Sequence, residues 1–200
     1  IAREFNVVAK QSLEKISAAE ADVFTTVSGI TAKECSYFLG KDVDLVTPNG
    51  FEDSFVPPAQ EFAKKQQAAK DKLRSVAEAV LGYKLDENCM FIVNSGRYEY
   101  RNKGVDIFID SLGELNKEEK LNRECVAFLL MPAYHRGPRE DLIDILYNNG
   151  SPNGVDRYLT HCLHYPSSDP VLGNISRNGL TNEKKEKVKI IFAPSYLNGN

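Results

Sequence analysis

The sequence has no tryptophan, no closely spaced pair of cysteines, and no apolar run long enough to cross a membrane. Its longest apolar run, from Cys125 to Ala133, is far shorter than the ~20 residues that a membrane span needs. We find no signal peptide at the amino end. The formal net charge is -3 and the pI is about 5.7. These absences argue against a membrane protein, and the weak negative charge argues against general binding to nucleic acid.

Cysteine is also scarce, and its spacing excludes two classes of protein. The 4 cysteines are too far apart for the paired ligands of a zinc site or for a disulfide-stapled secreted domain. Cys89 and Cys125 open apolar segments, so we expect them to be buried thiols. Reduced thiols are typical of the cytoplasm, which is where we expect this protein to function.

The rest of the composition is that of a folded chain. The 200 residues are 42% hydrophobic and 26% charged. This is enough for one domain, or for one domain and part of another, and it excludes global disorder. The chain begins at Ile1 rather than at methionine, and it ends at Asn200 shortly after an apolar segment. We interpret it as a piece of a larger protein.

Hydrophobic periodicity predicts helices that alternate with strands. Helical spacing predicts helices over residues 5–20, 30–39, 58–80, 104–115 and 138–146. Short apolar or β-branched runs predict strands over residues 21–27, 44–47, 90–93, 126–131 and 188–192. The glycine- and proline-rich residues 150–180 are predicted to be irregular, with a short helix over 156–163. This order predicts an α/β fold, a Rossmann-like parallel sheet with flanking helices.

A change of composition between Gly50 and Pro58 indicates a domain boundary. The segment follows the turn-forming Pro48-Asn49-Gly50 sequence and closes with two consecutive prolines. We therefore expect residues 1–55 to belong to one unit and residues 56–200 to a second.

The strongest candidate site is the polar segment between the predicted strand at 90–93 and the next helix. In open α/β sheets, ligands bind beyond the carboxyl ends of the strands. A helix N-terminus at that place offers free N–H groups and a partial positive charge. Gly96 and Gly104 let the backbone approach a ligand closely. Arg97 and Lys103 add two positive charges that suit phosphate oxygens, so the segment predicts a binding site for a diphosphate.

The same residues also fit an ordinary surface turn. In that interpretation Arg97 pairs with Glu99 or Asp106, and Lys103 is merely solvated. The segment matches neither the G-x-G-x-x-G fingerprint nor a Walker loop, so its spacing does not identify a ligand.

Two other clusters carry weaker signals. His161 and His164 flank Cys162, but no nearby carboxylate or further cysteine completes a metal site, so a structural role is favoured. The predicted helix over 58–80 carries several lysines together with acidic residues, which is typical of a solvated helix face rather than a nucleic-acid surface.

Several longer motifs occur in a consistent order along the chain. They are Ala21–Ser28, Thr47-Pro48-Asn49-Gly50, Gly96-Arg97-Tyr98-Glu99-Tyr100 with Asn102-Lys103-Gly104, Met131-Pro132-Ala133 and Val188–Phe192. Together they resemble the glycogen synthases of the eukaryotic type, which form glycosyltransferase family 3. The resemblance is patchy, but it spans nearly the whole chain.

The resemblance implies a retaining glycosyltransferase with the two-domain GT-B fold. Such enzymes transfer glucose from a nucleotide sugar, UDP-glucose in this type, to the 4-hydroxyl of an α-1,4-glucan. Residues 1–55 would be the tail of the N-terminal Rossmann-like domain, and residues 56–200 the first part of the nucleotide-sugar-binding domain. Arg97 and Lys103 align with the family's catalytic arginine and lysine, which hold the donor phosphates next to Gly96. The resemblance implies no metal and no cofactor.

The chain also departs from the family pattern. The family's glutamate motif has no counterpart before Asn200, and the family's long helical insertion is replaced by the short segment 134–187. We therefore expect the 200-residue piece to be inactive by itself. Its expected partners are the sugar nucleotide and the glucan, with no nucleic acid and no membrane, and the oligomeric state of the whole enzyme stays open. The alternatives are a GT-B enzyme with another donor or acceptor, or a non-catalytic glucan-binding module.

Overall fold

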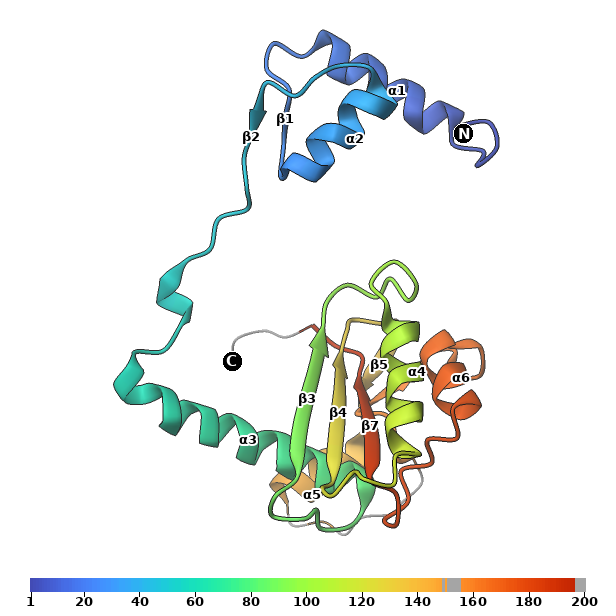
Figure 1. Ribbon diagram of the computed structural model, residues 1–200. Helices are drawn as coiled ribbons and strands as arrows, with labels where there is room; N and C mark the ends of the chain where they lie inside the picture. Colours follow the sequence, from blue (N-terminus) through green and yellow to red (C-terminus); the bar gives the residue numbers. More distant parts are fainter. Residues whose placement is uncertain (149, 151–155, 197–200) are drawn as a thin grey trace. The chain divides into compact units, whose positions relative to one another are not determined.

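The computed structural model of the protein describes residues 1–148, 150 and 156–196 (Figure 1). The chain divides into two compact units, Ile1–Pro57 and Pro58–Asn200, and each is described by itself. Both units combine parallel strands with helices, so the predicted α/β class is confirmed. Within the described ranges, no helix has both the length and the apolar character that crossing a bilayer requires.

The first unit contains a small parallel sheet and two helices. Its elements are α1 (Val8–Glu20), β1 (Thr25–Thr26), α2 (Gly29–Leu39), β2 (Leu45–Val46) and the 3-10 turn η1 (Asp53–Phe55). Local signals set the ends of α2. At the start of the helix, the Ser28 hydroxyl accepts a hydrogen bond from the N–H of Thr31. At its end, Gly40 adopts the left-handed conformation with a φ of 73°.

Burial in the first unit differs from the prediction. Among residues 1–57, all of which the structure describes, Ala18 is the only buried hydrophobic residue. The predicted apolar face of α1 is exposed, with Leu13 at 68% and Ile16 at 62%. The predicted strand over 21–27 is reduced to the two residues of β1. A sheet of two such short strands is too narrow to cover the face of a helix.

The second unit is built on a parallel sheet with the strand order β3-β4-β7. The strands are β3 (Met90–Ser95), β4 (Cys125–Leu130) and β7 (Val188–Ala193). The helices are α3 (Ala59–Leu81), α4 (Val105–Asn116), α5 (Glu140–Tyr147) and α6 (Pro170–Arg177). A separate antiparallel pair is formed by β5 (His135–Pro138) and β6 (His161–Leu163), which the 3-10 turn η2 (Pro166–Ser168) follows.

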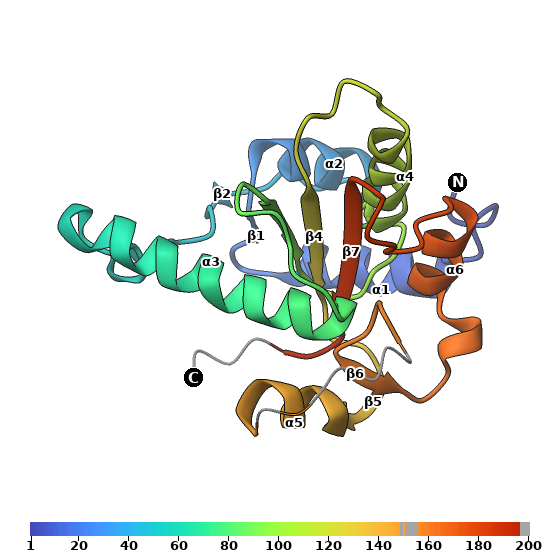
Figure 2. The ribbon, with the colours of Figure 1, turned by 90° about the horizontal axis from the view of Figure 1, so that it is seen from below.

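Helices cover both faces of this sheet. Figure 1 shows α4 in front of the strands with α6 beside it, and Figure 2 shows α3 and α5 on the other side. Alternate residues of β4 pack on opposite faces of the sheet. Ala127 and Leu129 belong to the core under α4 and α6, whereas Val126 and Phe128 belong to the core under α3 and α5. The continuous apolar run of β4 therefore reflects burial on both faces, as predicted, and β7 is buried in the same way apart from the charge of Lys189.

β3 is less buried than its apolar sequence predicts. It lies at the edge of the three-stranded sheet and pairs with β4 on one side. Its Val93 is 48% exposed. The four predicted apolar residues identified the strand correctly, but they do not reveal whether a strand is central or at an edge, because that depends on the strand order.

The short helix predicted over residues 156–163 is wrong. Part of this segment is β6, and Leu159 forms a parallel bridge with Phe192 instead. The buried Arg139 guanidinium donates to the carbonyls of Asp156 at 2.6 Å and Leu159 at 2.9 Å. These bonds occupy carbonyls that a helix would use, and the N–H groups of Tyr158 and Leu159 donate to the Asp156 carboxylate instead of to helical carbonyls.

The same region contains α6, which the sequence analysis did not predict. The helix begins after Asp169. Oδ1 of its carboxylate accepts hydrogen bonds from the N–H groups of Val171 and Leu172, both with an N···O distance of 3.0 Å. Asp followed by Pro170 is a good start signal for a helix, so the information was present in the sequence. The predicted irregular residues 151–155 lie outside the described residues.

A buried ion pair joins β7 to the start of β4. The Lys189 side chain is 0% exposed, and its Nζ lies 2.6 Å from Oε1 of Glu124. The ammonium also donates to the carbonyl of Glu186 and lies over the ring of Tyr83. Removing one partner of such a pair leaves an uncompensated buried charge, which typically costs about 3–5 kcal/mol.

The packing of α4 on α6 predicts opposite effects for two helical glycines. A Cβ on Gly113 of α4 would lie 2.8 Å from the Cβ of Asn178, whereas a Cβ on Gly173 of α6 would meet no atom within 4 Å. We expect Gly113→Ala to lower the free energy of unfolding by about 1–3 kcal/mol. Gly173→Ala should raise it by up to about 1 kcal/mol, because alanine favours helix. Urea unfolding measures both, and equal effects would contradict this packing.

Candidate functional site

The polar loop of residues 96–104 lies at the carboxyl edge of the three-stranded sheet. β3 leads into the loop and α4 follows it (Figure 1). Ser95 pairs with Leu130, and Leu130 pairs with Ala193, so the three strands end at the same level. The Gly96 N–H donates to the Leu130 carbonyl at 3.3 Å, which anchors the start of the loop. Open α/β sheets bind their ligands at this edge.

The two cationic residues of the prediction are both exposed on this loop. Nε of Arg97, a side chain that is 77% exposed, lies 3.1 Å from Oε1 of Glu99. Such an exposed pair contributes roughly 0–1 kcal/mol to stability. The guanidinium can therefore leave the Glu99 carboxylate and bind another anion at little cost. Lys103 is exposed, and among the described residues no partner for its ammonium is found. A Cβ on Gly96 would meet no atom within 4 Å, so the backbone beside Arg97 is open.

The N-terminus of α4 does not offer the free N–H groups that the sequence analysis expected. The N–H groups of Val105 and Asp106 donate to the Tyr100 carbonyl at 3.0 and 3.3 Å. The Ile107 N–H donates to the Asp106 carboxylate at 2.9 Å. Gly104 makes this tight turn with a φ of 65°, which suits glycine. An anion at this loop would therefore be held by cationic side chains rather than by the helix terminus.

Tyr98 ties the loop to the body of the unit. Its hydroxyl donates to Oδ2 of Asp169 at 2.6 Å, and its ring lies 5.7 Å from the ring of Phe192. Burial, and then the hydrogen bond to Asp169, raise the pKa of Tyr98 well above its usual range. The other oxygen of the same carboxylate caps α6. One partly buried contact therefore anchors the backbone beside Arg97 to the start of α6.

A hollow of about 560 Å³ lies between this loop and α6. It is lined by Arg101 and Arg177, which the sequence analysis missed, and by three aspartates that include Asp106. Arg177 donates to the Tyr100 hydroxyl at 3.3 Å and to the Asn174 amide oxygen at 3.0 Å. The carboxylates offset the two guanidinium groups, so this hollow does not favour an anion. Arg101 could have been found from its place in the loop, whereas Arg177 is distant in sequence.

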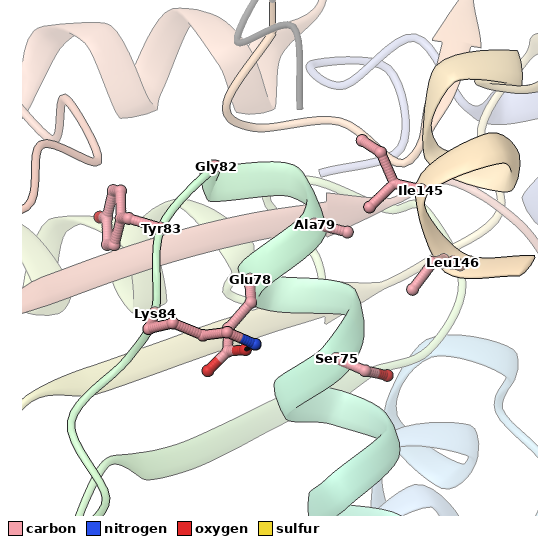
Figure 3. Close-up of a pocket in the computed structure, with 8 residues that line it drawn as sticks. All are labelled: Ser75, Glu78, Ala79, Gly82, Tyr83, Lys84, Ile145 and Leu146. Atoms are coloured by element: carbon pink, nitrogen blue, oxygen red, sulfur yellow. Dashed lines mark hydrogen bonds and ion pairs between the residues drawn. The ribbon is translucent and has the colours of Figure 1, made fainter. Parts of the chain in front are cut away.

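A second hollow, of about 380 Å³, lies between α3 and α5 (Figure 3). The charged side chains there point toward each other, with Nζ of Lys84 2.6 Å from Oε2 of Glu78. Glu78 also accepts the N–H of Leu85 at 3.2 Å. Ala79 and Ile145 form part of the apolar wall. Because its polar groups are already paired within the protein, this hollow is a weaker candidate than the loop.

The histidines are held by packing and do not converge on a common point. Within the described residues, no group of three or more histidine, cysteine or acidic side chains could hold a metal ion. The rings of His135 and His161 lie edge to face, 4.6 Å apart, and His164 stacks on Tyr134 at 4.0 Å. All four cysteines are free thiols. Cys125 is buried as expected, while Cys89 is half-buried, and burial raises the pKa of Cys89 to about 11.

The class of protein follows from this architecture. A parallel sheet with helices on both faces, and a basic loop at its carboxyl edge, defines a Rossmann-like α/β protein. Comparison with known proteins then identifies the family, because the family described as glycogen synthase matches residues 2–138. The chain belongs to the glycogen synthase family.

Relatives from fungi and mammals agree with this assignment. The chain is 30% identical to the glycogen [starch] synthase of Neurospora crassa over 92% of its length. It is 29% identical to isoform 1 of Saccharomyces cerevisiae over 94%, and 28% identical to the liver protein of Homo sapiens over 98%. The chain spans about a third of the length of these relatives, between 34% and 36%.

The contact between Tyr98 and Asp169 predicts a double-mutant coupling. Asp169→Ser keeps a residue that caps α6 but cannot reach the phenol. Asp169→Asn keeps the cap at its amide oxygen, and its NH2 can donate to the phenol oxygen. We expect Tyr98→Phe and Asp169→Ser each to lower the unfolding free energy by about 1–2 kcal/mol, with a combined loss smaller than their sum. Both should speed amide hydrogen exchange in residues 97–103, and Asp169→Asn should do so least. Additive losses would show that the two side chains act independently.

His161 predicts a loss of stability in mild acid. Burial, and then the charge of His135, lower the pKa of His161 below its ordinary value of about 6.5. The unfolded chain therefore takes up this proton first, so the stability contribution is complete above about pH 6.5 and is lost as the pH falls through the lower folded pKa. The urea midpoint should drop between about pH 7.5 and about pH 5.5, and His161→Gln should reduce that drop. His164→Gln is the control, and an unchanged drop in His161→Gln would refute the assignment.

Proposed function

We propose that this chain carries the donor-phosphate site of a glycogen synthase-type glycosyltransferase. The enzyme would transfer glucose from UDP-glucose to the 4-hydroxyl of an α-1,4-glucan with retention. Residues 1–55 would be the tail of its N-terminal Rossmann-like domain, and residues 56–200 the first part of its nucleotide-sugar-binding domain. Membership of the glycogen synthase family supports the reaction, and the names of the relatives support the glucan product.

The observation that carries the site is the position of Arg97 and Lys103. Both cations are exposed on a short loop at the carboxyl edge of the sheet. When the bond between the sugar and the diphosphate breaks, negative charge accumulates on the departing phosphate. An arginine fork and a lysine ammonium near that phosphate stabilise the charge, which is the contribution that a metal ion makes in other enzymes. Gly96 leaves the backbone beside them open to the ligand.

The pair between Arg97 and Glu99 fits this role. The carboxylate holds the guanidinium at the loop while no phosphate is bound, and the exposed pair is weak enough to be exchanged. Tyr98, between the two residues, is fixed by its hydrogen bond to Asp169, so the exchange needs side-chain rotation and no movement of the backbone.

We also place the protein in the cytoplasm, where the four free thiols would stay reduced.

The test is a calorimetric titration of the chain with UDP. Replacing both cations, Arg97→Ala with Lys103→Ala, should weaken binding by at least about tenfold, because each charge-assisted hydrogen bond contributes roughly 1.5–3 kcal/mol. Glu99→Gln should tighten binding, since it frees the guanidinium. The loop contacts phosphates and not the base, so ADP should respond to these variants as UDP does.

The control removes two exposed lysines from α3, Lys64→Ala with Lys70→Ala, and so makes the same change in net charge elsewhere. That variant should bind UDP as the unaltered chain does. Binding that survives the loss of Arg97 and Lys103 would show that this loop is not the phosphate site. A folded chain that does not bind UDP would show that the loop alone does not hold a diphosphate.

A further inference from the structure

An exposed group of aromatic side chains lies where the chain leaves the carboxyl edge of β4. It consists of Tyr134, His164 and Tyr165, which we call the aromatic face. The ring of His164 stacks on Tyr134 with a centroid distance of 4.0 Å, and Tyr165 lies 6.3 Å from Tyr134. Both tyrosines are 69% exposed. The contacts among the three rings leave most of both tyrosine side chains available to a ligand.

Backbone pairing holds the aromatic face in place. β5 and β6 pair antiparallel, with His135 opposite Leu163, and the His164 N–H donates to the Tyr134 carbonyl at 3.1 Å. The preceding Ala133 donates its N–H to the carbonyl of Pro194, just beyond β7, at 3.2 Å. The aromatic face is therefore fixed to the sheet edge from which the loop of Arg97 and Lys103 also extends.

A hollow of about 680 Å³ lies along β5 and β6, and its lining includes Leu163 and Pro166, which flank His164 and Tyr165 in the sequence. Its volume lies within the roughly 300–1,000 Å³ that is common for ligand pockets. Arg139 in its wall is already bound to Asp141, with Nη2 2.5 Å from Oδ2. Arg136 and Glu140, also on its wall, are exposed and opposite in charge. Such a lining favours a neutral ligand with many hydroxyl groups over a phosphate or a charged peptide.

We propose that the aromatic face and this hollow bind an α-1,4-glucan chain. One side of a glucose ring presents C–H groups, which pack on the electron-rich face of a tyrosine, while the hydroxyls project from the rim. The rim hydroxyls would meet Arg136 and Glu140 as well as the phenol groups. The surface lies at the edge of the proposed donor site, so it would hold the glucan near the sugar nucleotide. This inference rests on the proposed function for its choice of sugar.

The experiment is an NMR titration of the 200-residue chain with maltoheptaose. Tyr134→Ala and Tyr165→Ala should each weaken binding about tenfold, because each removes a large stacking surface. Tyr134→Phe keeps the ring and should keep the affinity within about twofold. Tyr147→Ala is the matched control, since that tyrosine is 73% exposed on α5 and does not contribute to the aromatic face.

A parallel titration with UDP separates the two proposals. We expect the aromatic variants to bind UDP normally, and the variant without Arg97 and Lys103 to bind maltoheptaose normally. If only the phosphate-site proposal is wrong, the unaltered chain still binds maltoheptaose, and Tyr134→Ala and Tyr165→Ala still weaken that binding. If the unaltered chain does not bind maltoheptaose, or if Tyr134→Ala and Tyr165→Ala bind it normally, the glucan surface is refuted. If Tyr134→Ala weakens UDP binding instead, the aromatic face stacks on a nucleobase and the glucan proposal is wrong.

Discussion

The parallel pairing of β4 with β3 on one side and β7 on the other is the constraint on which the second unit depends. It brings together three segments that are far apart in the chain and aligns their carboxyl ends. Because β4 is central, its two faces need separate cores, and α4 with α6 and α3 with α5 supply them. The loop at 96–104 and the turn into β5 both leave this sheet at the same edge.

That edge has two chemically different surfaces. The loop presents an exposed guanidinium, weakly paired with Glu99, and an ammonium, so it suits an anionic group that arrives and departs. Its backbone is held by the hydrogen bond of Tyr98. The aromatic face presents exposed rings beside a hollow of mixed charge, so it suits a neutral ring. A transferase that joins a charged donor to an uncharged polymer needs both kinds of surface close to each other. Under the two proposals, the charged donor and the uncharged glucan would bind at neighbouring surfaces of this edge.

Much of the fold could be predicted because its signals are local. Gly40 and Gly82 end helices in the left-handed conformation, as their positions after apolar periods indicate. β4 is buried on both faces, as its unbroken apolar run predicts, and β7 is buried in the same way although its sequence includes Lys189. The loop of the candidate site lies between a strand and a helix, as its polar composition predicts. Each of these features depends on a few consecutive residues, so no knowledge of the strand order was required.

What the sequence by itself determined is the family, the helices and strands with strong local signals, and the loop that holds Arg97 and Lys103. The tertiary structure alone decided that β3 is an edge strand and that the N–H groups of α4 are already occupied. It also decided that Lys189 pairs with Glu124 in the core. The N–H groups of α4 bond to Tyr100 and Asp106, so their occupancy depends on how the loop itself turns. The strand order and the Lys189 pair depend on contacts between residues that are distant in the chain. Such contacts form only when the sheet assembles, because a buried polar group finds its partner through the packing of whole elements.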